Sequence, residues 1–239
     1  MTEAAFRTDP YRSAIESVVT RSGDGWVELA ATVFYPTGGG QPGDTGRLVA
    51  AEQELDVVDT IKGEAPGSIR HVLADGASLA PGTTVRAVLD WPRRHRLMRM
   101  HTCLHLLCRA VDGVVTGGQI GDGKGRLDFD IPESILDKAA LTTQLNAWIE
   151  ADHAVRERWI EAAELDARPD LVKTMSVQPP RTGGRIRLVE IDGLDLQACG
   201  GTHVRSTAEI GPVKIAKIEK KGRQNRRVQV VFDAPEPMR

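Results

Sequence analysis

The chain has 239 residues, enough for one large domain or two ordinary ones, and its 41% hydrophobic and 27% charged residues are typical of globular proteins. A net charge of −2 excludes an overall positive field that would attract nucleic acid. Three cysteines argue against a disulfide framework, and no apolar run reaches the ~20 residues that span a bilayer. We therefore expect a cytoplasmic protein with no membrane partner.

Short β-prone segments alternate with glycine and proline in the first ninety residues. Candidate strands lie within 26–35, 47–62, 68–73 and 83–89, and the second of these ranges could hold two strands. Turn residues at such short intervals are typical of a small barrel or sandwich. The sequence therefore predicts a separate β-barrel module over residues 1–90.

A helix is predicted to begin directly after this module. Asp90 can cap it and Pro92 can occupy its first turn. Apolar residues then recur at helical spacing from Arg93 to Val111. In such a helix His101 and His105 lie one turn apart on the same face.

Strand and helix patterns alternate in the rest of the chain. Residues 114–131 predict two strands, and 134–165 is the longest helical pattern, with Trp159 among its expected core contacts. Strand-like alternation returns over 185–198 and 213–232.

The change of pattern predicts two domains. The first, residues 1–90, is all β, whereas the second, residues 91–239, mixes helices and strands. The fold class expected for the whole chain is therefore α+β.

Four possible metal ligands lie in two short motifs about a hundred residues apart. His101 and His105 form the first motif, and Cys199 and His203 form the second. Three imidazoles and one thiolate suit tetrahedral Zn²⁺, and each motif completes the other to four ligands. A purely structural zinc ion is the alternative, because a catalytic zinc usually keeps one position open.

Four segments carry a resemblance to a known family. They are the glycine-rich segment 34–46, the two metal-like motifs within 101–107 and 199–204, and the basic segment 209–228. With these segments the chain resembles the alanyl-tRNA editing proteins known as AlaX, freestanding relatives of the editing domain of alanyl-tRNA synthetase. The resemblance runs from about residue 26 to 232, and the glycine-rich segment indicates the medium-length type.

The resemblance implies a hydrolase that edits in trans. Its substrate would be tRNA(Ala) mischarged with serine, with glycine as a second candidate, and the ester at the tRNA 3′ end would be cleaved. Residues 91–239 would form the zinc-binding editing domain, with one Zn²⁺ held by His101, His105, Cys199 and His203. No ATP is expected, because the chain has no room for a synthetase's catalytic domain.

The resemblance also implies an amino-acid pocket beside the glycine-rich segment. A threonine hydroxyl at Thr37 could hydrogen-bond the serine side chain, a contact that alanine lacks. Gly39 and Gly40 would let backbone N–H groups approach the ester, although a plain tight turn is the alternative. The candidate pocket or positioning residues are Thr37, Gly39, Gly40, Gln41, Thr102 and Gln119.

Two basic segments are candidate contacts for tRNA phosphates. They lie at 93–99 and 214–227, and the alternative is a helix start and a solvated strand face. The candidate tRNA-binding residues are Arg93, Arg94, Arg96, Lys217, Lys220, Lys221, Arg226 and Arg227.

Two other functions remain open on the sequence. One is deacylation of another mischarged tRNA such as Ser-tRNA(Thr), and the other is a non-catalytic, zinc-stabilised RNA-binding module. The role of zinc is also open between activating water and positioning the aminoacyl ribose. No glutamate stands between the two histidines, so the acid/base residue of the H-E-x-x-H hydrolases is missing.

Overall fold

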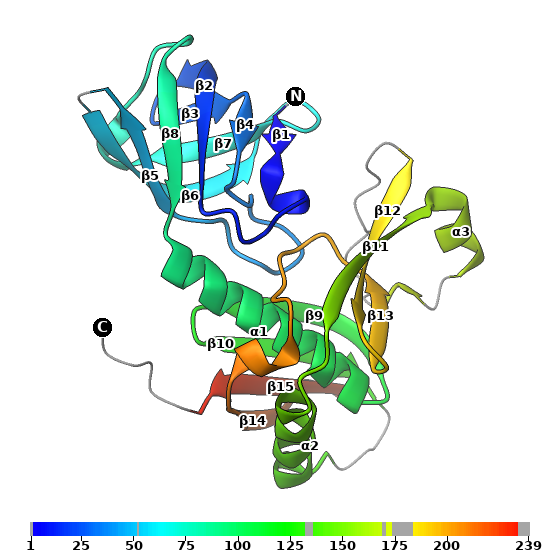
Figure 1. The fold of residues 1–239 in the computed structure, drawn as a ribbon. Helices are drawn as coiled ribbons and strands as arrows, with labels where there is room; N and C mark the ends of the chain where they lie inside the picture. The colour runs from blue at the N-terminus through cyan, green and yellow to red at the C-terminus, as the bar shows by residue number, and fades with distance from the viewer. Residues whose placement is uncertain (1, 52, 132–135, 169–170, 174–183, 234–239) are drawn as a thin grey trace. The chain divides into compact units, whose positions relative to one another are not determined.

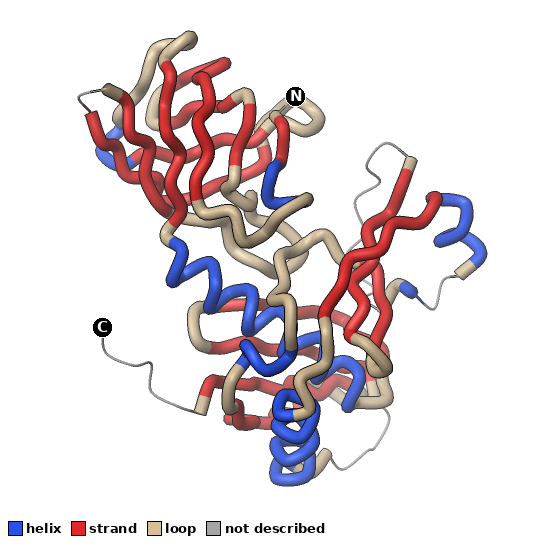
Figure 2. Tube along the Cα trace, in the orientation of Figure 1, coloured by secondary structure: helices blue, strands red, loops and turns tan. Residues whose placement is uncertain are grey.

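The structure, a computed structural model, falls into two compact units, Met1–His95 and Arg96–Arg239. Strand predominates in both units and helices are few (Figures 1 and 2). No helix in the described part of the chain combines the length and apolar character needed to cross a membrane. The described residues are 2–51, 53–131, 136–168, 171–173 and 184–233.

Six antiparallel strands close into a barrel in the first unit, as the sequence predicts (Figure 1). A two-residue strand, β1 (Glu3–Ala4), pairs in parallel with β4 (Ala31–Thr32). Short 3₁₀ helices stand at η1 (Ala5–Arg7) and η2 (Ala74–Gly76). In barrel order the six strands are β2 (Ala14–Gly23), β3 (Trp26–Leu29), β7 (Ile69–Leu73), β6 (Gln53–Lys62), β5 (Gly46–Ala50) and β8 (Thr84–Leu89).

The barrel interior is filled by alternate residues of its strands. In β2 the side chains of Ile15, Ser17 and Val19 are buried, whereas those between them are exposed. This period of two puts one face of each strand into the core, where Leu29 and Leu48 are fully buried. Burial of this apolar surface is the main force that closes the barrel.

A buried histidine lies among these apolar side chains. His71 Nδ1 lies 3.3 Å from the carbonyl oxygen of Val27, and its Nε2 lies 2.7 Å from Thr32 Oγ1. The ring is therefore satisfied when it is neutral, with Nδ1–H donating and Nε2 accepting. Burial lowers the pKa of His71 from 6.5 to about 4, although the bond to Val27 opposes the shift.

The free energy of unfolding is expected to fall on acidification because of His71. Its native pKa lies below the unfolded value of 6.5, so its contribution is intact above pH 6.5 and is lost as the pH falls toward 4. The loss between pH 7 and pH 5 should be about 2 kcal/mol. Urea unfolding across this range should show a shallower pH dependence for His71→Gln, and equal pH dependence in both proteins would contradict the assignment.

The long helix that carries two candidate ligands begins as predicted. Helix α1 (Trp91–Ala110) is capped by Asp90, whose Oδ1 accepts a hydrogen bond from the Arg93 backbone N–H at 3.1 Å. In the second unit it packs against β10 through Gly125, where a Cβ would lie 2.8 Å from Met100 Sδ. Glycine therefore permits the close approach of helix and sheet at this position.

The second unit also contains two antiparallel sheets, and strands lie within 114–131, 185–198 and 213–232 as the sequence predicts. A 3₁₀ helix, η4 (Thr207–Ile210), follows the last strand of the smaller sheet and precedes the strand that begins at Val213. The larger sheet has the order β14 (Val213–Lys220), β15 (Asn225–Phe232), β10 (Lys124–Asp130), β9 (Val114–Gly121), and the smaller has the order β11 (Val155–Glu161), β12 (Arg185–Ile191), β13 (Asp195–Ala198).

The single helix predicted over 134–165 is wrong. Helix α2 spans only Lys138–Glu150, and the chain then forms strand β11 and the short helix α3 (Ala162–Ala167). Trp159, expected in the core, is 38% exposed on β11. The buried residues of α2 account for the helical spacing in this range. The residues of β11 instead pair along the whole length of that strand with β12. The first part of the predicted range, through residue 135, lies outside the described residues.

Candidate metal centre

The four predicted ligands come together in the second unit. One ligand atom of each of His101, His105, Cys199 and His203 lies within 4.8 Å of all the others. The first two residues stand on α1, and the other two follow strand β13 directly. The three histidines are buried and the cysteine is partly buried, so the donor atoms converge in the interior.

The spacing of these atoms fits a tetrahedral zinc ion. Zn–N bonds of about 2.0–2.1 Å and a Zn–S bond of about 2.3 Å place sulfur and nitrogen ligands about 3.5 Å apart in a tetrahedron. Cys199 Sγ lies 3.5 Å from His101 Nε2 and 3.3 Å from His203 Nε2. Both the donor types and the separations therefore suit Zn²⁺.

Thr102 holds the ring of His203 in the orientation that a metal ligand needs. Its Oγ1 lies 3.1 Å from His203 Nδ1 and donates to the Met98 carbonyl oxygen at 3.1 Å. Because the hydroxyl proton is committed to Met98, the hydroxyl oxygen accepts from His203 Nδ1–H. Nε2 of His203 is then the unprotonated nitrogen, and it is the one that faces Cys199.

Asp195 makes the matching contact with His105. Its Oδ2 lies 3.4 Å from His105 Nδ1 and accepts a hydrogen bond from Gln197 Nε2 at 2.6 Å. Burial by itself would lower the pKa of His105, but the adjacent Asp195 carboxylate and the Cys199 sulfur raise it to about 9. A carboxylate behind a ligating imidazole is a common way to fix its orientation and increase its basicity.

The surroundings of Cys199 favour the thiolate form of its side chain. Burial by itself would raise the pKa of Cys199, but the nearby His101 and His203 hold it well below 9.0. The backbone N–H of Gly201 also points to the sulfur, at 3.5 Å. The thiolate is the form of cysteine that binds metals.

Sequence reasoning missed Asp195, Gln197 and Arg187. All three are buried or nearly buried polar side chains on β12 and β13, next to the second metal-like motif. An arginine within the apolar run 186–189 and a carboxylate just before the second metal-like motif were the available signals.

The glycine-rich segment of the first unit forms a tight hairpin. Gly38 and Gln41 exchange two backbone hydrogen bonds of 3.0 Å, and φ is 59° at Gly39 and 82° at Gly40. Positive φ at both central residues is the signature of a type I′ turn, which glycine adopts without strain. The tip is exposed and Gln41 is buried, while Thr37 Oγ1 accepts from the Gly43 N–H at 2.8 Å.

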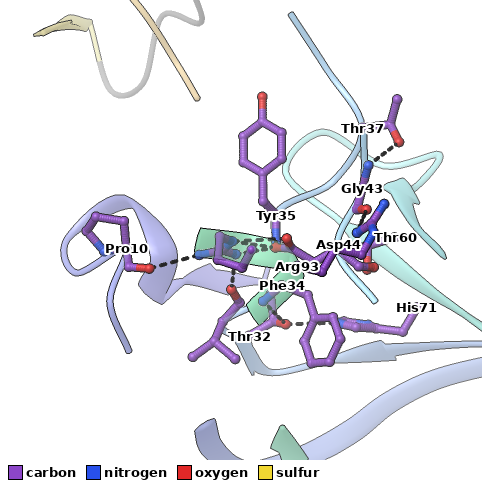
Figure 3. A network of polar contacts seen from close by, with 12 residues as sticks. Pro10, Thr32, Phe34, Tyr35, Thr37, Gly43, Asp44, Thr60, His71 and Arg93 are labelled. Atoms are coloured by element: carbon purple, nitrogen blue, oxygen red, sulfur yellow. Dashed lines mark hydrogen bonds and ion pairs between the residues drawn. The ribbon is translucent and has the colours of Figure 1, made fainter. Parts of the chain in front are cut away.

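A buried ion pair made by Asp44 closes the base of this segment, and Figure 3 shows Asp44 beside Tyr35 in the surrounding network of polar contacts. Asp44 Oδ2 accepts from the Tyr35 N–H at 2.5 Å, and the Asp44 N–H donates to the Tyr35 carbonyl at 3.0 Å. Arg94 Nε donates to both Asp44 carboxylate oxygens at 3.0 Å, and Arg94 Nη2 also contacts Oδ2. The other donors of Arg94 bond the carbonyl oxygens of Pro10 and Val33.

The prediction that Arg94 contacts tRNA is therefore wrong. Its side chain is 0% exposed and its guanidinium is committed to Asp44 and two backbone carbonyls. The basic run at 93–99 concealed this, because sequence does not distinguish a buried arginine from a solvated one.

The other candidate tRNA contacts stay predictions. Arg96 and Arg227 each make two hydrogen bonds with an aspartate, Asp122 and Asp128 respectively. Arg93 donates to the Gly43 carbonyl, and Arg226 donates to nearby backbone carbonyls. The three lysine candidates are exposed, and two of them, Lys217 and Lys221, contact Glu219; the third is Lys220. Gln119, a candidate pocket residue, is exposed on β9 and accepts from Arg126 Nε at 3.2 Å.

Comparison with known proteins identifies the class. The family model "Threonyl and Alanyl tRNA synthetase second additional domain" matches residues 186–229, which include Cys199 and His203. The model "tRNA synthetases class II (A)" matches residues 3–93 of the first unit. The chain thus combines sequence features of two tRNA synthetase families, and one of the two matches includes half of the candidate metal ligands.

Full-length relatives narrow this class to one family. Alanyl-tRNA editing protein AlaX-M of Methanosarcina acetivorans is 36% identical over 239 residues, covering 95% of this chain and 98% of the relative. AlaX-M of Saccharolobus solfataricus is 35% identical over 232 residues, with the same coverage. The alanine–tRNA ligase of Halorubrum lacusprofundi is 36% identical over 230 residues, 91% of this chain but 24% of the ligase. The chain belongs to the family of alanyl-tRNA editing proteins of the AlaX-M type.

Proposed function

We propose that this chain is an aminoacyl-tRNA deacylase that hydrolyses Ser-tRNA(Ala) in trans. The observation that carries the proposal is the cluster of His101, His105, Cys199 and His203, in a chain of which 95% aligns with an alanyl-tRNA editing protein. In this proposal residues 91–239 form the zinc-binding editing domain, and 1–90 form the glycine-rich-motif barrel module. The tRNA 3′ end would bring the mischarged ester to the metal centre.

The cluster would hold one Zn²⁺ ion. Bound zinc would supply positive charge that polarises the ester or activates water. The chain contributes the thiolate of Cys199, the neutral Nε2 of His203 fixed by Thr102, and the imidazole of His105 backed by Asp195. Thr102, a candidate pocket residue, is in this proposal a positioning residue, because its hydroxyl is already bonded to His203 and Met98.

The amino-acid pocket is proposed to include Thr37 and Gln41. Thr37 Oγ1 accepts from the Gly43 N–H and keeps its own proton, which it can donate to a serine hydroxyl. Gly39 and Gly40 lie at the exposed tip of the type I′ turn, where their N–H groups would approach an ester carbonyl.

Thr37→Val is expected to reduce the preference for Ser-tRNA(Ala) over Ala-tRNA(Ala) by about 10-fold, because valine keeps the volume and removes the hydroxyl. The two deacylation rates should be measured in parallel for wild type, Thr37→Val and Thr37→Ser. The serine variant retains the hydroxyl and should keep the preference. An undiminished preference in Thr37→Val would remove Thr37 from the pocket.

Release of amino acid from purified charged tRNAs tests the proposed function. Ser-tRNA(Ala) should be hydrolysed much faster than Ala-tRNA(Ala), and Gly-tRNA(Ala) and Ser-tRNA(Thr) show how far the activity extends. Tight tRNA binding without release from any of the four would instead support a non-catalytic RNA-binding module.

A further inference from the structure

A buried arginine contacts the loop that carries two of the candidate metal ligands. Arg187 stands on β12 between the buried residues Ile186 and Leu188, and its side chain is 7% exposed. Its Nη1 donates to the carbonyl oxygen of Cys199 at 2.9 Å and to that of Gly201 at 2.8 Å. One nitrogen therefore bridges two carbonyls on either side of the Cys-Gly-Gly turn.

The same residue also holds Cys199 from its amide side. The Cys199 N–H donates to the Arg187 carbonyl oxygen at 3.1 Å, which extends the pairing of β12 with β13 by one step. Gly201 is likewise held at both ends, because its N–H points to the Cys199 sulfur and its carbonyl accepts from Arg187. The backbone around the thiolate is thus fixed on both sides by one residue.

Glu157 fixes the guanidinium in turn. It lies on the neighbouring strand β11, and its Oε1 accepts from Arg187 Nη2 at 2.5 Å. The planar guanidinium can bond the carboxylate with one nitrogen and both carbonyls with another, which a lysine ammonium cannot reproduce.

Packing alone does not explain an arginine at this position. A buried guanidinium is unfavourable unless its donors are satisfied, and an apolar side chain would fill the space between the strands at lower cost. Among the described residues, none accepts a hydrogen bond from the buried Nε of Arg187. The bonds that the side chain does make are directed at the metal-ligand loop and at Glu157.

We propose that Arg187 is a positioning residue for the metal centre, which sets the place of the Cys199 thiolate through the carbonyls of Cys199 and Gly201. This inference rests on the metal site of the proposed function. Through its ion pair, Glu157 keeps the guanidinium in the bridging orientation. Arg187 does not touch the ligand atoms themselves and acts through the backbone of the loop.

The test measures metal binding in the absence of tRNA. Zn²⁺ affinity is determined by chelator competition, and the thiolate-to-metal charge-transfer absorption of the Co²⁺ form reports the Cys199 bond. Arg187→Met should lower Zn²⁺ affinity about 10- to 100-fold and weaken the Co²⁺ band, as expected for loss of a residue that orients a ligand. Arg187→Lys should fall between Arg187→Met and wild type, because it can restore only part of the bridge.

Arg185→Met is the matched control, because Arg185 lies on the same strand but is exposed and contacts the Trp159 ring. Its Zn²⁺ affinity should stay within about twofold of wild type. Wild-type affinity and an unchanged Co²⁺ band in Arg187→Met would overturn the inference. If Arg187→Met does not fold, Arg187→Lys and Glu157→Gln decide by the same measurements, and wild-type values in both overturn it. A wild-type chain that binds Zn²⁺ but releases no amino acid would refute the deacylase proposal alone.

Discussion

Cys199→Ala is expected to lose the bound metal and to lower the rate of Ser-tRNA(Ala) hydrolysis more than about 100-fold. The substitution removes the sulfur that lies 3.5 Å and 3.3 Å from two of the imidazole nitrogens and leaves three histidines that face one another. Their ring centroids are as close as 4.2 Å. The substitution also removes the negative charge of the thiolate from this group of closely packed imidazoles. Metal content and single-turnover serine release should be measured on the same preparation.

Cys108→Ala is the control for this experiment. Cys108 lies on α1 outside the cluster, and burial raises the pKa of its thiol to about 11, so it stays protonated near neutral pH. Its substitution should leave zinc content and serine release at wild-type levels. Serine release that persists in Cys199→Ala would show that the reaction does not need this metal centre.

Arg94→Met is expected to lower the free energy of unfolding of the first unit by about 3–5 kcal/mol. The substitution leaves the Asp44 carboxylate, 1% exposed, without its cation and frees the carbonyl oxygens of Pro10 and Val33. Because Asp44 also bonds the Tyr35 backbone, the base of the glycine-rich segment should loosen with the barrel. Urea unfolding of the variant measures the effect.

Two controls show whether the loss of stability comes from leaving a charge buried or from removing any charge: an exposed ion pair and a double variant. Arg47 and Glu54 lie 2.9 Å apart, but both side chains are 53% exposed, so Arg47→Met should cost at most about 1 kcal/mol. Adding Asp44→Asn to Arg94→Met removes the unpaired charge and should recover part of the stability. Equal losses in Arg94→Met and Arg47→Met would refute the structural role of the buried pair.

The sequence predicted those parts of the fold that depend on local pattern. Glycine and proline punctuation located most barrel strands, and Asp90 located the start of α1. Strand β2 was missed because its inward positions include Ser17, which breaks the apolar alternation. The helix over 134–165 was extended too far, because one amphipathic helix and one exposed strand together resemble a longer helical pattern.

The candidate site likewise has a part that the sequence predicts and a part that depends on tertiary contacts. Four ligands were visible as residue types at suitable spacing, and the structure brings them within 4.8 Å of one another. The residues behind them, Asp195 and Arg187, act through contacts that exist only once β12 and β13 have paired. Arg94 shows the converse, since only tertiary structure reveals that a residue in a basic run is an interior one.

The two halves of the metal centre are far apart in the chain, because Cys199 follows His101 by 98 positions. An ion bound by both halves would act as a removable cross-link. It would close the long loop between them and so restrict conformations that the unfolded chain can otherwise adopt. During synthesis the two histidines emerge well before the cysteine, and neither pair alone offers four ligands. Tight metal binding would therefore occur only after the second unit has folded.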